Sequence, residues 1–267
     1  MPSVTTHALL EMKQRGERIV ALTCYDALFA RLLDAAGIDI LLVGDSLNQV
    51  LAAAPSTLSA TLDQMIYHTR MVRRGTERAL VVCDMPFLTY QVSPDEAVRN
   101  CGRAMQETNC QAVKLEGGEH IAPTVRRLVD VGIPVMGHLG LTPQSVHALG
   151  GHRVQGRDEA SAERLKASAR VLQDAGVFAI VLELVPAPLA SHITKSLSIP
   201  TIGIGAGPAC DGQVLVLHDM LGLNDQFSAK FIKKYAALAE DVREAARVFA
   251  AEVREGRYPG PEHSFGK

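Results

Sequence analysis

The chain alternates short apolar runs with amphipathic stretches of helical length. Each run lacks a period of two and ends at a small or polar residue, which is typical of a parallel strand buried on both faces. The clearest run, 40–43, stops at Gly44 and is followed by Asp45 and Ser46. We expect eight strands, over residues 18–22, 40–43, 80–83, 112–115, 133–137, 177–182, 200–204 and 213–217.

Helical spacing fills the segments between these runs. Ser93 and Glu96 form a capping box with Pro94 at the first helical position, so a helix should begin there. The pattern predicts helices over 4–15, 27–36, 61–74, 93–108, 119–131, 160–175 and 229–253, and one that ends near 197. Eight strand-helix repeats without a change of composition predict an α/β protein, a single (β/α)8 TIM barrel that forms one catalytic domain over residues 1–267. An N-terminal helix and an extended C-terminal tail should flank it.

Composition narrows the classes of function. Of 267 residues, 47% are hydrophobic and 21% are charged, which suits a folded globular protein. The formal charge of −2, without a run of Lys or Arg, disfavours nucleic-acid partners. The five cysteines include no CxxC pair, so we expect neither disulfides nor a zinc site but a reducing, cytoplasmic location. No segment approaches the roughly 18 apolar residues that span a bilayer, so no membrane partner is expected.

Acidic side chains recur where the predicted strands end. Parallel strands of a barrel bring their carboxyl ends to one face, where clustered carboxylates would repel one another unless a cation joined them. Mg²⁺ prefers oxygen ligands and uses few carboxylates, so we predict that it binds Asp45, Asp84 and Glu116. The alternative is that these acids cap helices or pair with surface arginines.

Three further side chains at these strand ends are candidates for chemistry. Lys114 lies in an apolar strand two residues before Glu116, so both share a face. It could neutralise a substrate carboxylate, form a Schiff base, or make a structural ion pair. Glu183 follows an apolar run and is our candidate general base, with helix capping as the alternative. His138 could bind substrate or be a hydrogen-bonded core residue.

Two glycine-rich segments follow predicted strands. Residues 140–158 are long for a connection in a compact domain, which often marks a lid or a binding loop. The sequence GIGAG at 203–207 could bind phosphate through backbone amides or simply form a tight turn.

Nine motifs of the chain resemble, in order, those of the ketopantoate hydroxymethyltransferase (3-methyl-2-oxobutanoate hydroxymethyltransferase) family. They are VGDSLN, CDMPF, VKLEGGE, GHLGLTPQSV, GGHRVQGR, VLELVP, TIGIGAG, DGQVLVLHDMLG and YPGPEHSF. The chain departs from the family pattern in one loop, at Asn48 and at residues 53–55. The resemblance covers nearly the whole chain.

This resemblance implies a Mg²⁺-dependent barrel enzyme, with one ion per subunit. The family transfers a hydroxymethyl group from 5,10-methylenetetrahydrofolate to 3-methyl-2-oxobutanoate and forms 2-dehydropantoate in pantothenate synthesis, often as a homodecamer. Its metal ligands correspond to Asp45, Asp84 and Glu116, its base to Glu183, and its oxoacid contacts to Asp45, Ser46, Asp84 and Lys114. Alternatives are an aldolase or lyase that acts on another 2-oxoacid without folate, and a Schiff-base or phosphosugar barrel.

Overall fold

The computed structural model describes residues 2–266 and contains a closed barrel of parallel strands. Each strand pairs with the next in sequence, and the first pairs with the last. The strands are β1 Ile19–Thr23, β2 Ile40–Val43, β3 Leu80–Asp84, β4 Ala112–Glu116, β5 Val135–Gly140, β6 Ala179–Glu183, β7 Thr201–Ile204 and β8 Gly212–Leu215. The predicted TIM barrel is therefore confirmed. The fifth strand runs from Val135 through His138 to Gly140, whereas the prediction placed it over 133–137.

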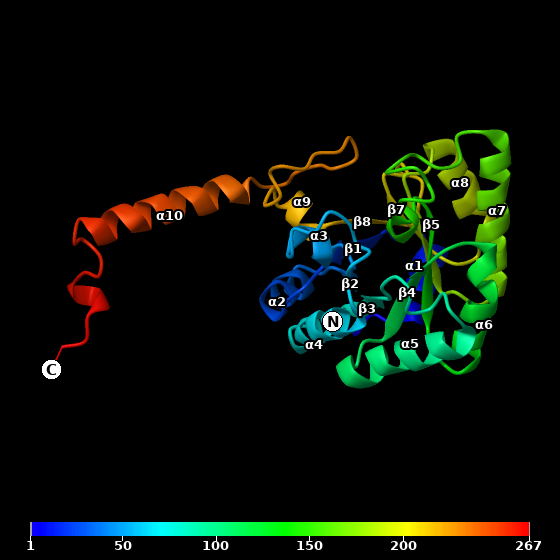
Figure 1. Cartoon of the computed structure of the whole chain (residues 1–267), viewed down its shortest axis with the longest axis horizontal. Helices are drawn as coiled ribbons and strands as arrows, with labels where there is room; N and C mark the ends of the chain where they lie inside the picture. Colours follow the sequence, from blue (N-terminus) through cyan, green and yellow to red (C-terminus); the bar gives the residue numbers. More distant parts are fainter. Residues whose placement is uncertain (1, 267) are drawn as a thin grey trace. The chain divides into compact units, whose positions relative to one another are not determined.

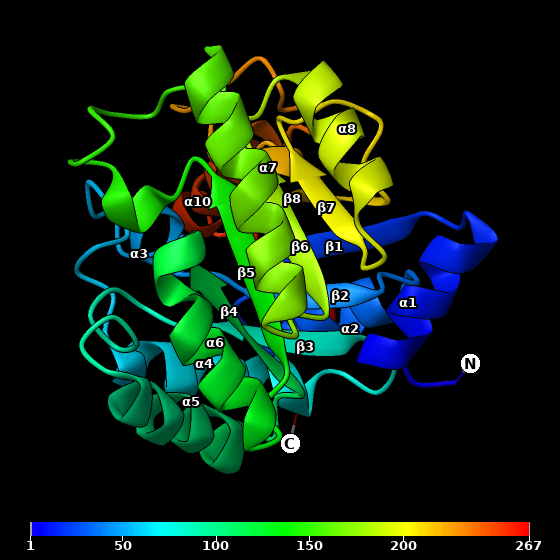
Figure 2. The ribbon, with the colours of Figure 1, turned by 90° about the vertical axis from the view of Figure 1, so that its right-hand side faces the viewer.

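Helices surround this barrel, and α4 to α8 lie outside the strands (Figures 1 and 2). Polar caps start several of them: the Ser93 hydroxyl accepts the Glu96 N–H at 3.1 Å, and Pro94 begins α5. The elements before residue 217 are α1 Thr6–Arg15, α2 Ala27–Ala35, α3 Leu47–Val50, α4 Leu62–Arg74, α5 Pro94–Thr108, η1 Glu119–Ile121, α6 Ala122–Asp130, η2 Pro143–Ser145, α7 Glu159–Asp174 and α8 Ala187–Ser196. The short helix α3, in the loop after β2, was not predicted.

The N-terminal helix α1 closes one end of the barrel. Leu9 is fully buried and belongs to the same core cluster as strand residues such as Ile19 and Leu80. Val4 N–H donates to the carbonyl of Arg78, which precedes β3, so this segment lies at the amino ends of the strands. The opposite end, where the strands finish, is left for the polar side chains described below.

Residues Leu217–Lys267 group into a second compact unit, separate from Met1–Val216. It contains α9 Leu217–Met220, α10 Leu238–Arg254 and η3 Pro261–His263. The prediction of a helix from residue 229 was wrong for 229–237, because the Tyr235 N–H bonds to the Met220 carbonyl and folds this segment back. The strand predicted over 213–217 ends at Leu215, where the chain turns into α9. That the whole chain acts as one catalytic domain stays a prediction.

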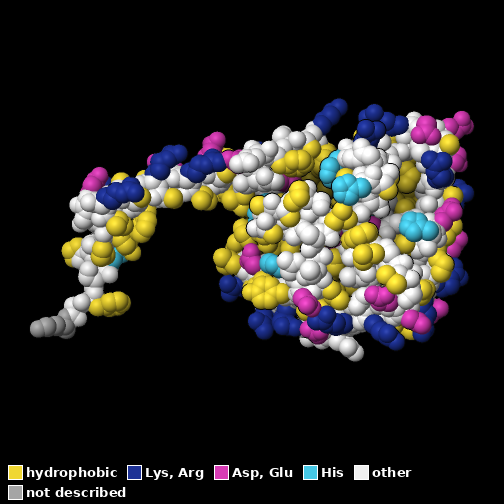
Figure 3. All heavy atoms as spheres, viewed as in Figure 1, with side chains coloured by type: hydrophobic (Ala, Val, Ile, Leu, Met, Phe, Trp, Pro, Cys, Tyr) yellow, Lys and Arg dark blue, Asp and Glu magenta, His cyan; other side chains and the backbone are white. Residues whose placement is uncertain are grey.

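Helix α10 is amphipathic and none of its residues is buried. Val242, Phe249 and Val253 recur at helical spacing and are 59%, 55% and 46% exposed. Figure 3 shows apolar side chains along one side of this helix and charged side chains along the other. The second unit therefore carries an apolar helix face that its own residues leave uncovered.

Neither a membrane helix nor a disulfide is found between residues 2 and 266. No helix in this part of the chain is long and apolar enough to cross a bilayer. The five cysteines are buried and have free thiols.

Candidate active site

The strands carry every predicted site residue to one end of the barrel. Asp45 follows β2, and Ser46 precedes α3. The others lie at or near the ends of strands: Asp84 on β3, Lys114 and Glu116 on β4, His138 on β5 and Glu183 on β6. Since parallel strands of a closed barrel finish at the same end, these side chains share the face where TIM-barrel active sites lie.

Lys114 lies between two of the predicted metal ligands. Its Nζ is 2.9 Å from Asp84 Oδ1 and 3.6 Å from Glu116 Oε1. The Asp45 N–H donates to Asp84 Oδ2 at 3.2 Å, which connects the third acid to the group. Asp45, Asp84, Lys114 and Glu116 are each at most 4% exposed. The structure thus brings the three predicted ligands and the lysine together in a buried cluster.

His138 extends this cluster to Glu183. Its Nδ1 is 3.3 Å from Glu116 Oε1 and 3.1 Å from Lys114 Nζ, and its Nε2 is 3.2 Å from Glu183 Oε2. The Glu183 side chain is 17% exposed, whereas that of His138 is only 4% exposed. Glu183 is therefore the member of this chain of contacts that solvent or a substrate reaches most easily.

The pKa values of the acids move in different directions. Burial raises the pKa of Asp45 well above its usual value, and the charges of Asp84 and Glu116 act in the same sense. Burial also raises the pKa of Asp84, against the opposing effect of Lys114. Burial disfavours ionised Glu116 too, but Lys114 and His138 outweigh it and lower the pKa of that carboxyl. The cluster therefore disfavours ionisation of all three carboxyls at once.

The neighbouring acids favour the protonated forms of Lys114 and His138. Burial acts to lower the pKa of Lys114, but Asp84, Glu116 and Asp45 outweigh it and raise that pKa. Burial and Lys114 act to lower the pKa of His138, yet Glu116 and Glu183 raise it to about 9. An ammonium is not a nucleophile, so this environment opposes the Schiff-base alternative for Lys114.

The acids leave two buried oxygens free of hydrogen bonds. Asp84 Oδ1 and Glu116 Oε1 are inaccessible to solvent and accept no hydrogen bond from any residue described, although Lys114 Nζ is at ion-pair distance from both. Among residues 2–266, no three His, Cys, Asp or Glu side chains are already arranged to hold a metal ion. Oxygen donors without hydrogen bonds suit a hard divalent cation, but the lysine lies between them.

Gln144, which the sequence analysis missed, contacts two of the predicted ligands. It lies in η2, within the glycine-rich connection after β5, and is 4% exposed. Its Nε2 donates to Asp45 Oδ2 at 2.9 Å, and its backbone N–H donates to Glu116 Oε2 at 3.0 Å. The Tyr90 hydroxyl lies 2.8 Å from Gln144 Oε1. No sequence signal singled out this glutamine beyond its place in a long connection after a strand.

Two loop residues hold the segment that follows β2. The Ser46 hydroxyl lies 2.9 Å from the Tyr25 hydroxyl. Asn48, where the chain departs from the family pattern, is 3% exposed and donates from Nδ2 to the Ser56 carbonyl at 2.8 Å and to Ser59 Oγ at 2.7 Å. The Asn48 side chain thus connects two later positions of the loop, and the Ser46 hydroxyl contacts a neighbouring tyrosine.

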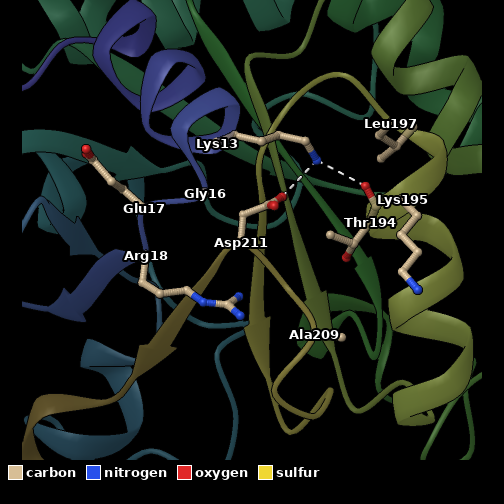
Figure 4. Close-up of a pocket in the computed structure, with 9 residues that line it drawn as sticks. All are labelled: Lys13, Gly16, Glu17, Arg18, Thr194, Lys195, Leu197, Ala209 and Asp211. Carbon is tan, nitrogen blue, oxygen red and sulfur yellow. Dashed lines mark hydrogen bonds and ion pairs between the residues drawn. The ribbon is translucent and has the colours of Figure 1, made fainter.

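A separate cavity of about 360 Å³ lies at the other end of the barrel. Its lining residues belong to segments that precede β1, β7 and β8, and include Arg18 and Lys195 (Figure 4). Lys13 Nζ bonds there to Asp211 Oδ2 at 2.9 Å and to the Thr194 carbonyl at 3.0 Å. Because this is the amino end of the strands, the cavity is distinct from the acid cluster.

The sequence profile of the family described as ketopantoate hydroxymethyltransferase matches residues 3–261. The chain belongs to the ketopantoate hydroxymethyltransferase family. The 3-methyl-2-oxobutanoate hydroxymethyltransferases of Moorella thermoacetica and Pelobacter propionicus are 57% and 55% identical to it over 262 residues. Each alignment covers 98% of this chain and 97% of the relative.

The enzyme transfers a hydroxymethyl group to 3-methyl-2-oxobutanoate in pantothenate biosynthesis. This identity implies 5,10-methylenetetrahydrofolate as the co-substrate. It also favours the transferase over the folate-free aldolase or lyase that the strand-end acids alone allowed.

Solved structures of low sequence identity share the fold. A 2,3-dimethylmalate lyase, a member of the PEP mutase/isocitrate lyase superfamily, has a TM-score of 0.61 and 18% identity, with coverage of 98% of this chain and 93% of that one. A phosphonopyruvate hydrolase solved with oxalate and Mg²⁺ has a TM-score of 0.64 and 13% identity, with coverage of 97% and 92%. These similarities support the barrel architecture alone.

Proposed function

We propose that one Mg²⁺ ion per subunit binds Asp45, Asp84 and Glu116. The main support is that Asp84 Oδ1 and Glu116 Oε1 are buried oxygens that accept no hydrogen bond and are compensated by ion-pair contacts with basic side chains. The net charge of the cluster also favours a divalent cation. With Asp45, Asp84, Glu116 and Glu183 ionised and with Lys114 and His138 protonated, these side chains together carry a charge of −2. Binding would require the ammonium of Lys114 to leave its place between the two oxygens, which its flexible side chain permits.

The ion would supply Lewis-acid stabilisation for negative charge that develops on the keto oxygen of the oxoacid. The ammonium of Lys114 would then bind the substrate carboxylate, for which its raised pKa keeps it charged. Asp45 and Asp84, which are joined by a hydrogen bond, would also contact the oxoacid, and the Ser46 hydroxyl, held by Tyr25, would orient it. These assignments explain why an enzyme for a small anionic substrate buries a lysine among acids.

Glu183 is the proposed general base that removes the C3 proton of 3-methyl-2-oxobutanoate. It ends β6 on the same face as the acid cluster, and it is the more exposed partner of the pair that it forms with His138. Carbanionic C3 would then form a bond to the one-carbon unit of the folate. Both bonds from that carbon to folate nitrogens break, water supplies the hydroxyl oxygen, and the nitrogens end protonated, which leaves tetrahydrofolate. His138 was predicted to contact the substrate. Its two ring nitrogens face Glu116 and Glu183, which supports a role in orienting Glu183 beside the oxoacid.

Replacing Glu183 by Gln tests the base directly. We expect Glu183→Gln to lose most deuterium exchange at C3 in D2O while it binds a divalent cation as the unaltered enzyme does, because Glu183 is not among the proposed ligands. Glu163→Gln, which removes an exposed carboxylate from α7, is the matched control and should exchange normally. Retained exchange in Glu183→Gln would remove this residue from the role of base.

We also propose that the enzyme is a homo-oligomer in the cytoplasm, and the family resemblance suggests a decamer. The uncovered apolar face of α10 supports self-association, since exposed apolar patches of this kind mark protein contacts. The five free thiols suit a reducing compartment.

A further inference from the structure

The side chain of Gln144 joins the ends of three strands. Its Nε2 donates to Asp45 Oδ2, after β2, and to the carbonyl of Met85, after β3, both at 2.9 Å. Its backbone N–H reaches Glu116 Oε2, at the end of β4, at 3.0 Å. Gln144 itself follows β5. One residue of the fifth loop therefore contacts two predicted metal ligands and the backbone next to the third, Asp84.

The carboxamide of Gln144 has no spare hydrogen-bonding capacity. An amide offers two N–H donors and two acceptor lone pairs. Asp45 and Met85 take the two donors, while Tyr90 Oη at 2.8 Å and Gln91 Nε2 at 3.3 Å approach Oε1. Turning the amide over would place its oxygen against a carboxylate and a carbonyl oxygen. The partners therefore fix one orientation of this buried group.

Tyr90 holds the other side of the same arrangement. Its hydroxyl accepts the Glu116 N–H at 3.1 Å and also lies 3.0 Å from the Glu116 carbonyl. Tyr90 is 1% exposed. Gln144 and Tyr90 thus support each other, and both the backbone and the carboxylate of Glu116 are fixed.

In Glu116 and Asp84, one carboxylate oxygen accepts a backbone N–H, whereas the other has only ion-pair contacts with basic side chains. Glu116 Oε2 accepts from the Gln144 N–H, whereas Glu116 Oε1 accepts no hydrogen bond within residues 2–266. Asp84 shows the same division, because Oδ2 accepts from the Asp45 N–H, whereas Oδ1 has only the ion-pair contact with Lys114 Nζ among residues 2–266. Hydrogen bonds to the non-ligating oxygen are how outer residues orient carboxylate ligands of a metal ion.

We propose that Gln144 is a positioning residue that holds Asp45 and Glu116 in place for the divalent cation. This inference rests on the cation site proposed above and adds a residue that touches neither the ion nor the substrate. The competing explanation is that Gln144 only fastens the loop after β5. In that case its loss would lower stability but leave the affinity for the cation unchanged.

Direct cation binding separates the two explanations. Mn²⁺ accepts the same oxygen ligands as Mg²⁺, and its free concentration can be followed by electron paramagnetic resonance without an activity assay. We expect Gln144→Leu and Gln144→Met to weaken Mn²⁺ binding by about 10- to 100-fold, the usual loss when an outer-shell partner is removed. The matched control is Gln173→Leu, which removes an amide that accepts from Ser198 on the outside of the barrel. It should bind Mn²⁺ normally.

The experiment also requires the stability of each variant and one substitution of a proposed cation ligand. Normal Mn²⁺ affinity in a folded Gln144 variant would overturn the proposal, and so would failure of both Gln144 variants to fold, which would make Gln144 a folding residue. Asp84→Asn tests the cation site itself and should lose binding. If it binds Mn²⁺ normally, the proposed site is wrong; if it loses binding while Gln144→Leu does not, only the positioning role is wrong.

Discussion

Lys114 Nζ lies 2.9 Å from Asp84 Oδ1 within the barrel, and both side chains are at most 4% exposed. A buried charge is costly unless another charge compensates it, so each member of this pair depends on the other. The lysine also faces Glu116, which makes it the common cation of two acids. Replacing Lys114 should therefore reduce the stability of the fold as well as substrate binding.

Lys114→Met should lower the free energy of unfolding of the metal-free enzyme by about 3 to 5 kcal/mol, because it leaves buried carboxylates without their cation. Saturating Mg²⁺ should restore part of this loss by replacing the missing charge. Urea unfolding with and without Mg²⁺ measures both effects. Lys166→Met, which removes an exposed pair with Glu163, should change stability by no more than about 1 kcal/mol. Equal effects of the two substitutions would contradict this account of the buried pair.

Asp34 should stabilise the fold in a pH-dependent way. Burial disfavours its ionised form, but the N–H groups of Ala79, Glu77 and Arg78 donate to the carboxylate and lower its pKa. A lowered pKa in the folded state gives stability that is present above the unfolded value of roughly 3.9 and is lost as the pH falls through the folded pKa.

Asp34→Asn should therefore reduce the free energy of unfolding at pH 7 by about 1.5 to 3 kcal/mol, the range for hydrogen bonds to a charged group. The difference from the unaltered protein should shrink in denaturant titrations below pH 4. Asp130→Asn, at an exposed aspartate that ends α6, is the control. A difference that stays constant down to pH 2 would exclude the ionised carboxylate as its source.

Asn48 should hold the loop that follows β2. Because Asn48→Ala removes the donors to the Ser56 carbonyl and Ser59 Oγ, we expect local opening of residues 51–60 to become easier by about 1.4 kcal/mol, or roughly tenfold. Amide hydrogen exchange of that segment measures the change. Gln49→Ala, at the next, partly exposed position, should leave exchange unaltered. Unchanged exchange in Asn48→Ala would mean that other contacts fix the loop.

The apolar face of α10 should mediate self-association. Changing Val242 and Phe249 together to Glu places charge on that face, so we expect a smaller assembly in light scattering after size exclusion. Arg247→Ala, which removes an exposed guanidinium paired with Glu244, should leave the assembly intact. An assembly of unchanged mass in the double variant would exclude this face as the contact.

Much of the fold followed from local patterns because each strand is a short apolar block that ends at a polar residue. This rule located Asp84, Glu116 and Glu183 at the last positions of β3, β4 and β6. It was less accurate where a strand continues through polar residues, as β5 does through His138. Helical spacing alone also misassigned 229–237, because a long-range bond from Tyr235 to Met220 decides the path there.

Gln144 shows what the sequence could not reveal. Its segment has no apolar period, and the partners of its hydrogen bonds are 28 to 99 residues away in the sequence. The position of Lys114 between two acids was likewise beyond a pattern argument, which established only a shared strand face with Glu116. Such contacts arise when loops from different strands meet, so they depend on tertiary geometry.

We propose that the acid cluster and a divalent cation together allow removal of the C3 proton. The most direct measurement is the NMR signal of that proton in D2O, with enzyme and Mg²⁺, then after chelation, and then with methylenetetrahydrofolate added. We expect exchange that needs the cation but not the folate, and 2-dehydropantoate only once the folate is present. Exchange that persists after complete chelation, or product formation without any cation, would contradict the account.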